Sequence, residues 1–327
     1  MRELENRRAG RVVAPQPWLK FPLSPSAFPI LRQKLSGNYY YSKQRYSEYS
    51  ALKLARFSLT SANYSYDYFG STSKFVLRKP SPTHGTSAVG VLLNIERELD
   101  TFRSGDLEVA SKFAREIELR LSTDVESNLE MLPSSHSPDI SWGHLDHSSG
   151  FPGLIVEIAY SQKRKALKDL AYEYFCTSLG KTRIMIGVDI ESSGKSRKAT
   201  LLMWKSWLEH DATGAQVKYD LCAESVFRND DGSPNLDSGI EFSLQEIAPD
   251  APFSEQVANC KVRIDGAKLY ERLCNAEELE KAWKTEAKEA KEAQERPESA
   301  IRLPQHLDRS PEEMMEKYPG LGVRSVP

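Results

Sequence analysis

The fold is decided by the stretch from Gly150 to Phe175, which reads GFPGLIVEIAYSQKRKALKDLAYEYF. Its first half, LIVEIAY at 154–160, is a continuous apolar run, typical of a central strand that is covered on both faces. The residues that follow, 162–178, repeat apolar side chains at helical spacing. Glu157 sits in the middle of the apolar strand, and burying an unpaired charge is costly. We therefore expect Glu157 to be paired, protonated or bound to a ligand.

This strand and helix begin a β-α-β unit. A second apolar run, RIMIGVDI at 183–190, follows the helix directly. Two strands joined by a crossover helix pair in parallel, and the crossover is right-handed. ATLLMWKSWLE at 199–209 predicts a further strand. The pattern indicates an α/β protein.

The residues before this unit predict two helices and two more strands. Apolar side chains recur at helical spacing over 88–102 and 107–121, whereas 125–132 and 138–146 are typical of strands separated by a turn at 133–137. From residue 107 the predicted order is therefore α-β-β-β-α-β. Late strands are expected at 217–228 and 239–247, and a Lys/Glu/Ala-rich helix at 266–296.

Composition divides the chain into four parts. Residues 1–86 are rich first in Pro and Arg and then in Ser and Tyr, and we expect this arm to be mostly disordered. Residues 87–250 form the predicted domain. Residues 251–297 form a helical extension, and 298–327 a disordered tail.

The overall composition limits the class of protein. The 327 residues are 39% hydrophobic and 28% charged, and the net charge is −2, so the global balance favours neither a nucleic-acid nor a membrane partner. No two cysteines form a C-x-x-C pair, which favours a reducing compartment. The charged N-terminus lacks an apolar signal region, and no run of about 18 apolar residues exists. We expect an intracellular protein in the cytoplasm or nucleus, with no membrane span.

Two acidic residues fall at related places in the predicted order. Asp139 begins the second strand and Glu157 lies within the third. Adjacent strands bring both side chains to one edge of the sheet, and two carboxylates with water form a site for Mg²⁺ or Mn²⁺. Such an ion activates water and stabilises a leaving phosphate oxygen. His136, His144 and His147 offer zinc as a weaker alternative, although the last two do not have helical spacing.

The chain contains SPD at 137–139, GLIVEIAYSQ at 153–162, the helix that follows, and MIGVDI at 185–190. This set resembles the PD-(D/E)XK nuclease superfamily, which has the restriction-endonuclease-like fold. The similar members are restriction-endonuclease families with a K-x-x-x-Y helix, and fungal proteins with an S-P-D … E-x-A-Y-S-Q pattern. The resemblance covers roughly residues 107–210. It implies a mixed sheet with helices on both faces and a metal-dependent hydrolysis of phosphodiester bonds.

The resemblance also implies roles for individual residues. Asp139 and Glu157 match the metal-binding carboxylates. The family then has a lysine two residues after the glutamate, where it orients water and stabilises negative charge, but this chain has Ala159. The substitutes are Lys168, then Gln162. The other candidates are Lys165 as a third substitute, Glu116 or Glu118 as a third acid, and Asp189 as the match of a family aspartate.

The departure at Ala159 leaves three hypotheses open. The first is a metal-dependent nuclease that uses Lys168 or Gln162. The second is a catalytically inactive scaffold that binds nucleic acid or a protein. The third is a structural domain in which Glu157 forms an ion pair. Residues 150–205 contain ten Lys or Arg residues but only five Asp or Glu residues. The basic rim at 163–198 is therefore the candidate nucleic-acid surface.

Overall fold

The computed structural model describes residues 18–36, 65–78, 81–120, 124–127, 133–145, 150–160, 164–191, 196–212 and 214–294. The chain divides into two compact units, Met1–Glu277 and Glu278–Pro327. All described strands belong to the first unit, and the described part of the second is the end of helix α8 (Gly266–Gln294). Among the described residues, no helix has both the length and the apolar character needed to cross a bilayer.

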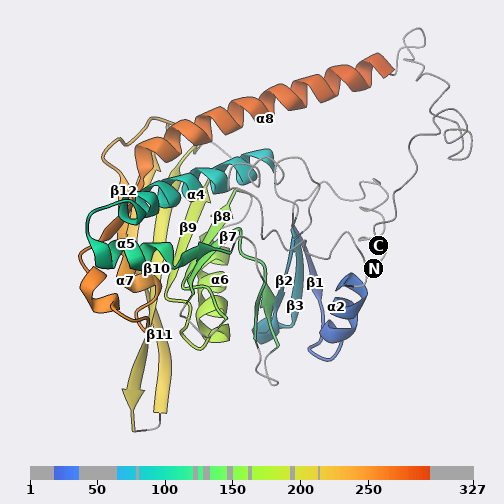
Figure 1. The fold of residues 1–327 in the computed structure, drawn as a ribbon. Coiled ribbons are helices and arrows are strands. Elements are labelled where there is room, and N and C mark those ends of the chain that lie inside the picture. Colours follow the sequence, from blue (N-terminus) through green and yellow to red (C-terminus); the bar gives the residue numbers. More distant parts are fainter. Residues whose placement is uncertain are drawn as a thin grey trace, which may run out of the picture. The chain divides into compact units, whose positions relative to one another are not determined.

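A six-stranded mixed sheet forms the centre of the first unit (Figure 1). In sheet order its strands are β11 (Gly214–Arg228), β10 (Ala199–Asp211), β9 (Ile184–Ile190), β8 (Leu154–Ala159), β7 (Ile140–His144) and β4 (Ile117–Leu119). β8 and β9 are parallel and are joined by helix α6 (Arg164–Thr177), as predicted; every other neighbouring pair is antiparallel. The α/β class is confirmed.

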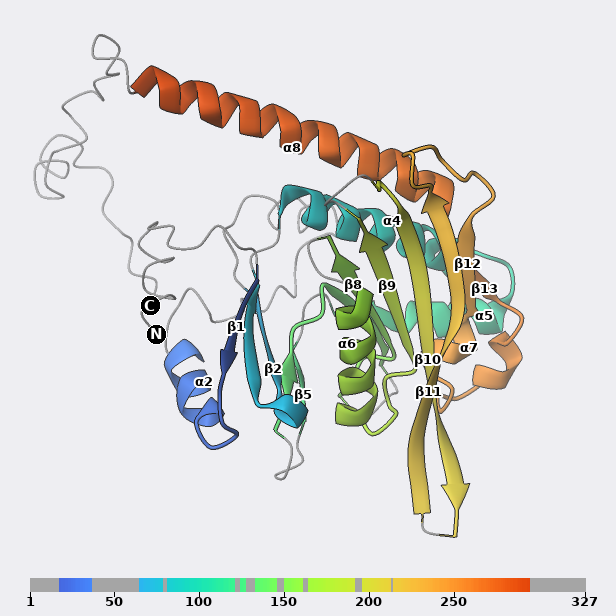
Figure 2. The ribbon, with the colours of Figure 1, turned by 180° about the vertical axis from the view of Figure 1, so that it is seen from behind.

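Helices cover both faces of this sheet (Figures 1 and 2). Ile155 and Ala159 of β8 pack with α6 side chains, whereas Val156 and Ile158 pack on the other face. That second face is covered by α4 (Pro82–Arg103) and α5 (Glu108–Arg115). Every side chain of β8 is therefore buried, which explains why the strand has a continuous apolar sequence rather than an alternating one.

A second sheet takes three of its five strands from residues 1–86, which we predicted to be mostly disordered. Its five strands, in sheet order, are β1 (Trp18–Pro22), β3 (Lys74–Arg78), β2 (Ser65–Phe69), β6 (Ser135–His136) and β5 (Val125–Glu126), with helix α2 (Phe28–Ser36) after β1. The prediction for 1–86 is thus corrected for its described residues. The sequence SYDYFGSTSKFVLR forms a hairpin, because aromatic and β-branched residues on either side of a Gly/Ser turn favour paired strands.

Three predicted elements in the middle of the chain differ from the structure. The helix predicted over 107–121 ends at Arg115, and β4 follows, because Phe113 and Ile117 satisfy a helical and an extended pattern equally well. The strand predicted over 125–132 is limited to β5 within the described residues. The turn predicted at 133–137 contains β6, which pairs with β2 and β5.

The late elements complete the first unit. β12 (Gly239–Ser243) pairs with β13 (Lys261–Asp265), a strand that the sequence analysis did not predict. The strand predicted over 239–247 ends at Ser243, because Ser243 and Glu246 form a capping box that starts the short helix α7 (Leu244–Ile247). The long helix predicted over 266–296 is present as α8.

Candidate functional site

Two neighbouring strands bring the predicted carboxylates together. β7 pairs with β8 so that Ile140 lies opposite Val156. Asp139 directly precedes β7, and its side chain accepts a hydrogen bond from the Ile158 backbone N–H of β8, the residue after Glu157. This contact holds the Asp139 carboxylate beside the strand that carries Glu157. The convergence that the sequence predicts for the two acids is therefore present.

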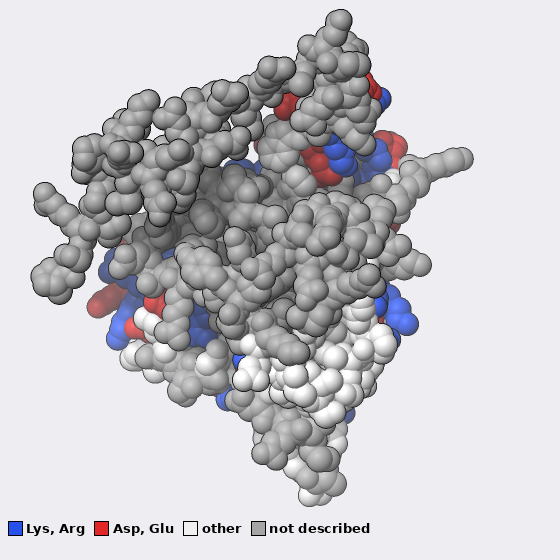
Figure 3. Space-filling view, turned by 90° about the vertical axis from the view of Figure 1, so that its right-hand side faces the viewer, with Lys and Arg blue, Asp and Glu red and all other residues white. Residues whose placement is uncertain are grey.

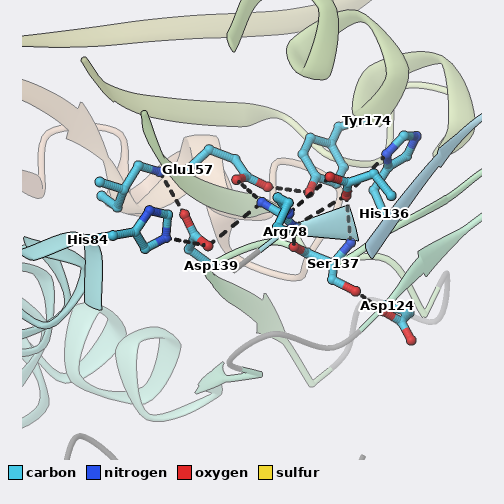
Figure 4. Close-up of polar contacts among 10 residues, drawn as sticks. Arg78, His84, Asp124, His136, Ser137, Asp139, Glu157 and Tyr174 are labelled. Carbon is cyan, nitrogen blue, oxygen red and sulfur yellow. Dashed lines mark hydrogen bonds and ion pairs between the residues drawn. The ribbon is translucent and has the colours of Figure 1, made fainter. Parts of the chain in front are cut away.

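The guanidinium of Arg78, the last residue of β3, lies between these carboxylates (Figure 4). Its Nη1 is 3.0 Å from Glu157 Oε2 and 3.8 Å from Asp139 Oδ1. Its Nε is 3.0 Å from Asp67 Oδ2, and its Nη2 donates a hydrogen bond to the Ser137 carbonyl. Burial alone would lower the pKa of Arg78, but the surrounding carboxylates raise it, so the side chain stays charged. One buried cation thus faces three carboxylates.

Every oxygen of the Asp139 and Glu157 side chains already faces a protein donor. Glu157 Oε1 accepts a hydrogen bond from the Tyr174 hydroxyl of α6 at 2.5 Å, and Oε2 faces the guanidinium. Asp139 Oδ2 accepts a hydrogen bond from the Ile158 backbone N–H at 2.7 Å. Asp139 Oδ1 lies 3.0 Å from His84 Nε2, near the start of α4. The four carboxylate oxygens are therefore shared among a guanidinium, a phenol, an amide and an imidazole.

This arrangement does not fit the Mg²⁺ or Mn²⁺ ion that the resemblance implies. Both ions require free oxygen ligands, and Mg²⁺ demands near-octahedral geometry at about 2.0–2.1 Å. Arg78 Nη1 lies within ion-pair distance of both carboxylates, so a cation between them would meet a second positive charge. Arginine supplies here the charge compensation that a metal would supply in the family, which answers why Glu157 is tolerated within an apolar strand.

The electrostatic balance of the site leaves Glu157 prone to hold a proton. Burial has the largest effect on the pKa of Glu157 and raises it. The positive charge of Arg78 lowers this pKa, but the negative charges of Asp139 and Asp67 raise it further, to about 8. Burial also disfavours ionised Asp139, yet His84 and Arg78 outweigh it and lower the pKa of that carboxyl below its usual value. The pKa values of the two acids are thus pushed apart, and Glu157 takes up a proton at a higher pH than Asp139 does.

A second buried imidazole extends the network toward the N-terminal sheet. His136 of β6 is fully buried, with Nδ1 3.6 Å from Asp67 Oδ1 and Nε2 3.5 Å from Glu173 Oε2. Burial opposes protonation of His136, but these two carboxylates outweigh it and raise its pKa to about 9. Asp67 belongs to β2 and Glu173 to α6, so His136 connects β2, β6 and α6. Glu173 also accepts a hydrogen bond from Ser71, in the turn after β2.

The predicted substitutes for the missing lysine do not complete the site. Lys168 and Lys165 are exposed on the outer side of α6, and neither makes a hydrogen bond or ion pair with the site among the described residues. Gln162 lies outside the described residues. Ala159 is fully buried, and it lies opposite Asp189 in the parallel pair of β8 and β9. Burial raises the pKa of Asp189, although the positive charge of Arg164 lowers it in part. The cation that reaches Glu157 is Arg78.

The remaining acid and histidine candidates lie in other surroundings. Glu116 follows α5 and pairs with buried His144 at 3.3 Å, while Glu118 is an exposed residue of β4. His147 lies outside the described residues. His136 and His144 therefore have different partners, and the described residues do not unite them in the zinc site considered from the sequence.

Sequence reasoning missed the residues that compensate the two acids. Arg78, Asp67 and His84 all lie before residue 87, in or next to the region interpreted as disordered. A usable signal was the hairpin pattern that ends in Arg78, since an arginine at the end of an apolar strand needs a buried partner. Tyr174 was predicted to face the core, which is correct, but its hydrogen bond to Glu157 was not foreseen.

Comparisons with known proteins add no identification. Neither a family model nor a curated protein matches the chain.

Proposed function

We propose that the chain is a nuclease-fold binding protein that does not hydrolyse phosphodiester bonds. The observation that carries this proposal is the position of Arg78, whose guanidinium pairs with Asp139 and Glu157 where the family holds its metal ion. Metal-assisted hydrolysis needs free carboxylate oxygens for the ion and a cation that orients the attacking water. The oxygens here have protein donors, the lysine position is Ala159, and Lys168 is exposed.

The order of the elements supports a nuclease-like ancestry. Along the chain, the central sheet and its helices follow the order α5, β4, β7, β8, α6 and β9. This is the α-β-β-β-α-β order of the restriction-endonuclease-like fold, with Asp139 before the second strand and Glu157 in the third. β4 takes the place of the first strand, which the sequence analysis put at 125–132.

A protein partner fits the surface better than nucleic acid does. Four cations of the predicted basic rim at 163–198 form ion pairs with three acids: Arg164 with Glu224, Lys181 and Arg183 with Asp250, and Arg197 with Glu277. On the face drawn in Figure 3, the described Lys and Arg atoms are interspersed with Asp and Glu atoms. Binding to a phosphate backbone depends on cations that are free to replace counterions.

The second candidate is the metal-dependent nuclease that the sequence indicates. One observation favours it, because Asp139 and Glu157 converge on a single atom of Arg78. This candidate requires Arg78 to leave the site and a residue outside the described part of the chain, such as Gln162, to replace the family lysine. It would make Arg78 an inhibitory side chain.

The two candidates differ in their response to divalent metal. Since a ligand that binds only the folded state raises its melting temperature, we expect millimolar Mg²⁺ or Mn²⁺ to leave that of the wild type unchanged. We also expect no cleavage of single- or double-stranded DNA or RNA, and the same null results for Lys168→Ala. The measurements are differential scanning fluorimetry and a gel-based nuclease assay on the full chain.

A positive result has to pass a control for contaminating nuclease. A metal-induced rise in melting temperature, together with cleavage that is lost in both Asp139→Asn and Glu157→Gln, would replace the proposal by the nuclease candidate. Cleavage that persists in both variants would come from a contaminant. Salt-sensitive binding of uncut nucleic acid would keep the inactive scaffold but change the class of partner.

A further inference from the structure

The hairpin formed by β10 and β11 extends beyond the rest of the central sheet. β9 pairs with β10 only from Ala199 to Lys205. From Ser206 to Asp211, β10 has β11 as its only strand neighbour in the described chain, and this two-stranded arm protrudes in both ribbon views (Figures 1 and 2). Val217 and Tyr219 at its base pack against the α6-side cluster, whereas Trp207 is 44% exposed, and a two-stranded hairpin is only marginally stable by itself.

The outer side of β11 is the open edge of the sheet along this arm. β11 is the last strand in the sheet order. Its final residues are covered on the outer side, since Asn235 bonds to Val226 and Phe227, and Gly239 to Ser225. Within the described chain, the residues from 214 to 224 have no strand on that side. The pairing of β11 with β10 is regular from Gly214 to Leu221 and shifts at Cys222, and the Leu221 N–H donates a hydrogen bond to Asp220 Oδ1. The regular part of this edge can present its outward backbone donors and acceptors to another strand once the Asp220 carboxylate turns to a new partner.

We propose that β11 is a self-association edge, on which two copies of this chain pair their β11 strands antiparallel about a twofold axis at Tyr219. In this register Lys218 lies opposite Asp220 of the other copy, and the symmetry creates this ion pair twice. Val217 lies opposite Leu221 of the other copy in the same way. A C₂ interface uses the same patch on both copies, so a strand with complementary residues at equal distances from its centre is self-complementary.

Charge disfavours the two registers that are centred one residue to either side of Tyr219. The side-chain alternation of the strand allows only shifts that keep a residue on the axis. A twofold axis at Lys218 would oppose two lysines, and an axis at Asp220 would oppose two aspartates, which destabilises a cross-strand pair. An axis at Leu221 would bring Ser225 into the pairing, where the outer side is already covered. The axis at Tyr219 avoids both problems.

The apolar side chains agree with the same register. Tyr219 packs against Phe175 and Tyr172 of α6, with ring centroids 5.8 and 6.1 Å apart. Leu221, two residues further along and on the same face, is 37% exposed, and Tyr172 is 45% exposed. Pairing the edges would place Val217 of the second copy beside Leu221 and continue the α6-side cluster across the axis. This inference does not depend on the site at Arg78.

Charge reversal tests the proposed register. Lys218→Asp places four acids along the interface and Asp220→Lys places four lysines, so each variant should self-associate about tenfold or more weakly than wild type. The double variant Lys218→Asp/Asp220→Lys restores two opposite-charge pairs and should dimerise. An equimolar mixture of the two single variants should also form a dimer, since the acids of one face the lysines of the other. Sedimentation equilibrium on the full chain measures each case.

Two controls separate the interface from the fold. Glu241→Lys reverses an exposed charge on β12, away from the proposed edge; Glu241 pairs with Arg263 within one copy, and this variant should dimerise like wild type. Equal melting temperatures would show that the exposed substitutions leave the fold intact. A wild type that is monomeric at high micromolar concentration, or single variants that associate as wild type does, would overturn the proposal.

Discussion

Replacing Arg78 with alanine should lower the free energy of unfolding by about 3–5 kcal/mol, the cost typical of removing one partner of a buried ion pair. The side chain is 4% exposed and faces Asp67, Asp139 and Glu157. Its removal leaves three buried acids without their shared cation. Arg78→Lys should recover only part of the loss, because an ammonium cannot reproduce the planar contacts of a guanidinium. Urea unfolding followed by circular dichroism measures the difference.

A matched control separates this buried pair from ordinary surface charge. Arg263 pairs with Glu241 at 2.8 Å, but both side chains are nearly half exposed. Arg263→Ala should therefore cost less than about 1 kcal/mol. If Arg78→Ala also cost less than about 1 kcal/mol, Arg78 would not hold the carboxylates in solution, and their oxygens would be free to bind a metal ion.

The part of the fold that local sequence determines was predicted correctly. β8, α6 and β9 were recognised because a two-sided buried strand has no polar alternation, and because α6 repeats Leu167, Leu170 and Tyr174 at helical spacing. The end of α5 was not predictable in the same way. The boundary between α5 and β4 depends on pairing with β7, which no short window of sequence contains.

The candidate site was only half predictable for the same physical reason. Asp139 and Glu157 are close in sequence and lie on adjacent strands, so their meeting follows from strand order. Arg78 is 79 residues from Glu157 and reaches it because β3 ends beside β8. No periodicity encodes that approach. The sequence therefore indicated that Glu157 needs compensation, but assigned it to a metal and a helix-borne lysine rather than to an arginine from the N-terminal sheet.

Stability should fall as pH rises from about 6.5 to about 9. A group whose pKa is higher in the folded state than in the unfolded state stabilises the fold at low pH and loses that contribution as pH passes the folded value. The pKa of His136 rises from 6.5 to about 9, so its contribution is lost over the whole of this range. The pKa of Glu157 rises from 4.5 to about 8, so its contribution is already falling at pH 6.5 and is lost by about pH 8. Asp139, whose pKa is lowered, acts oppositely and weakens the fold only in acid. Thermal unfolding across this pH range measures the slope.

Glu157→Gln isolates the contribution of the central acid. The amide resembles the protonated carboxyl at every pH, whereas the wild type loses the contribution of its proton between about pH 4.5 and pH 8, so the stability of the variant relative to wild type should rise over this range. At pH 9 the variant should be more stable by at least about 1 kcal/mol, because the wild type then holds an extra buried negative charge beside Asp139 and Asp67, and one unit of pKa shift is worth about 1.4 kcal/mol. Glu241→Gln, at an exposed pair, should leave the pH profile unchanged. If Glu157→Gln were equally destabilised at both ends of this range, Glu157 would be ionised throughout, and Arg78 alone would then balance all three carboxylates.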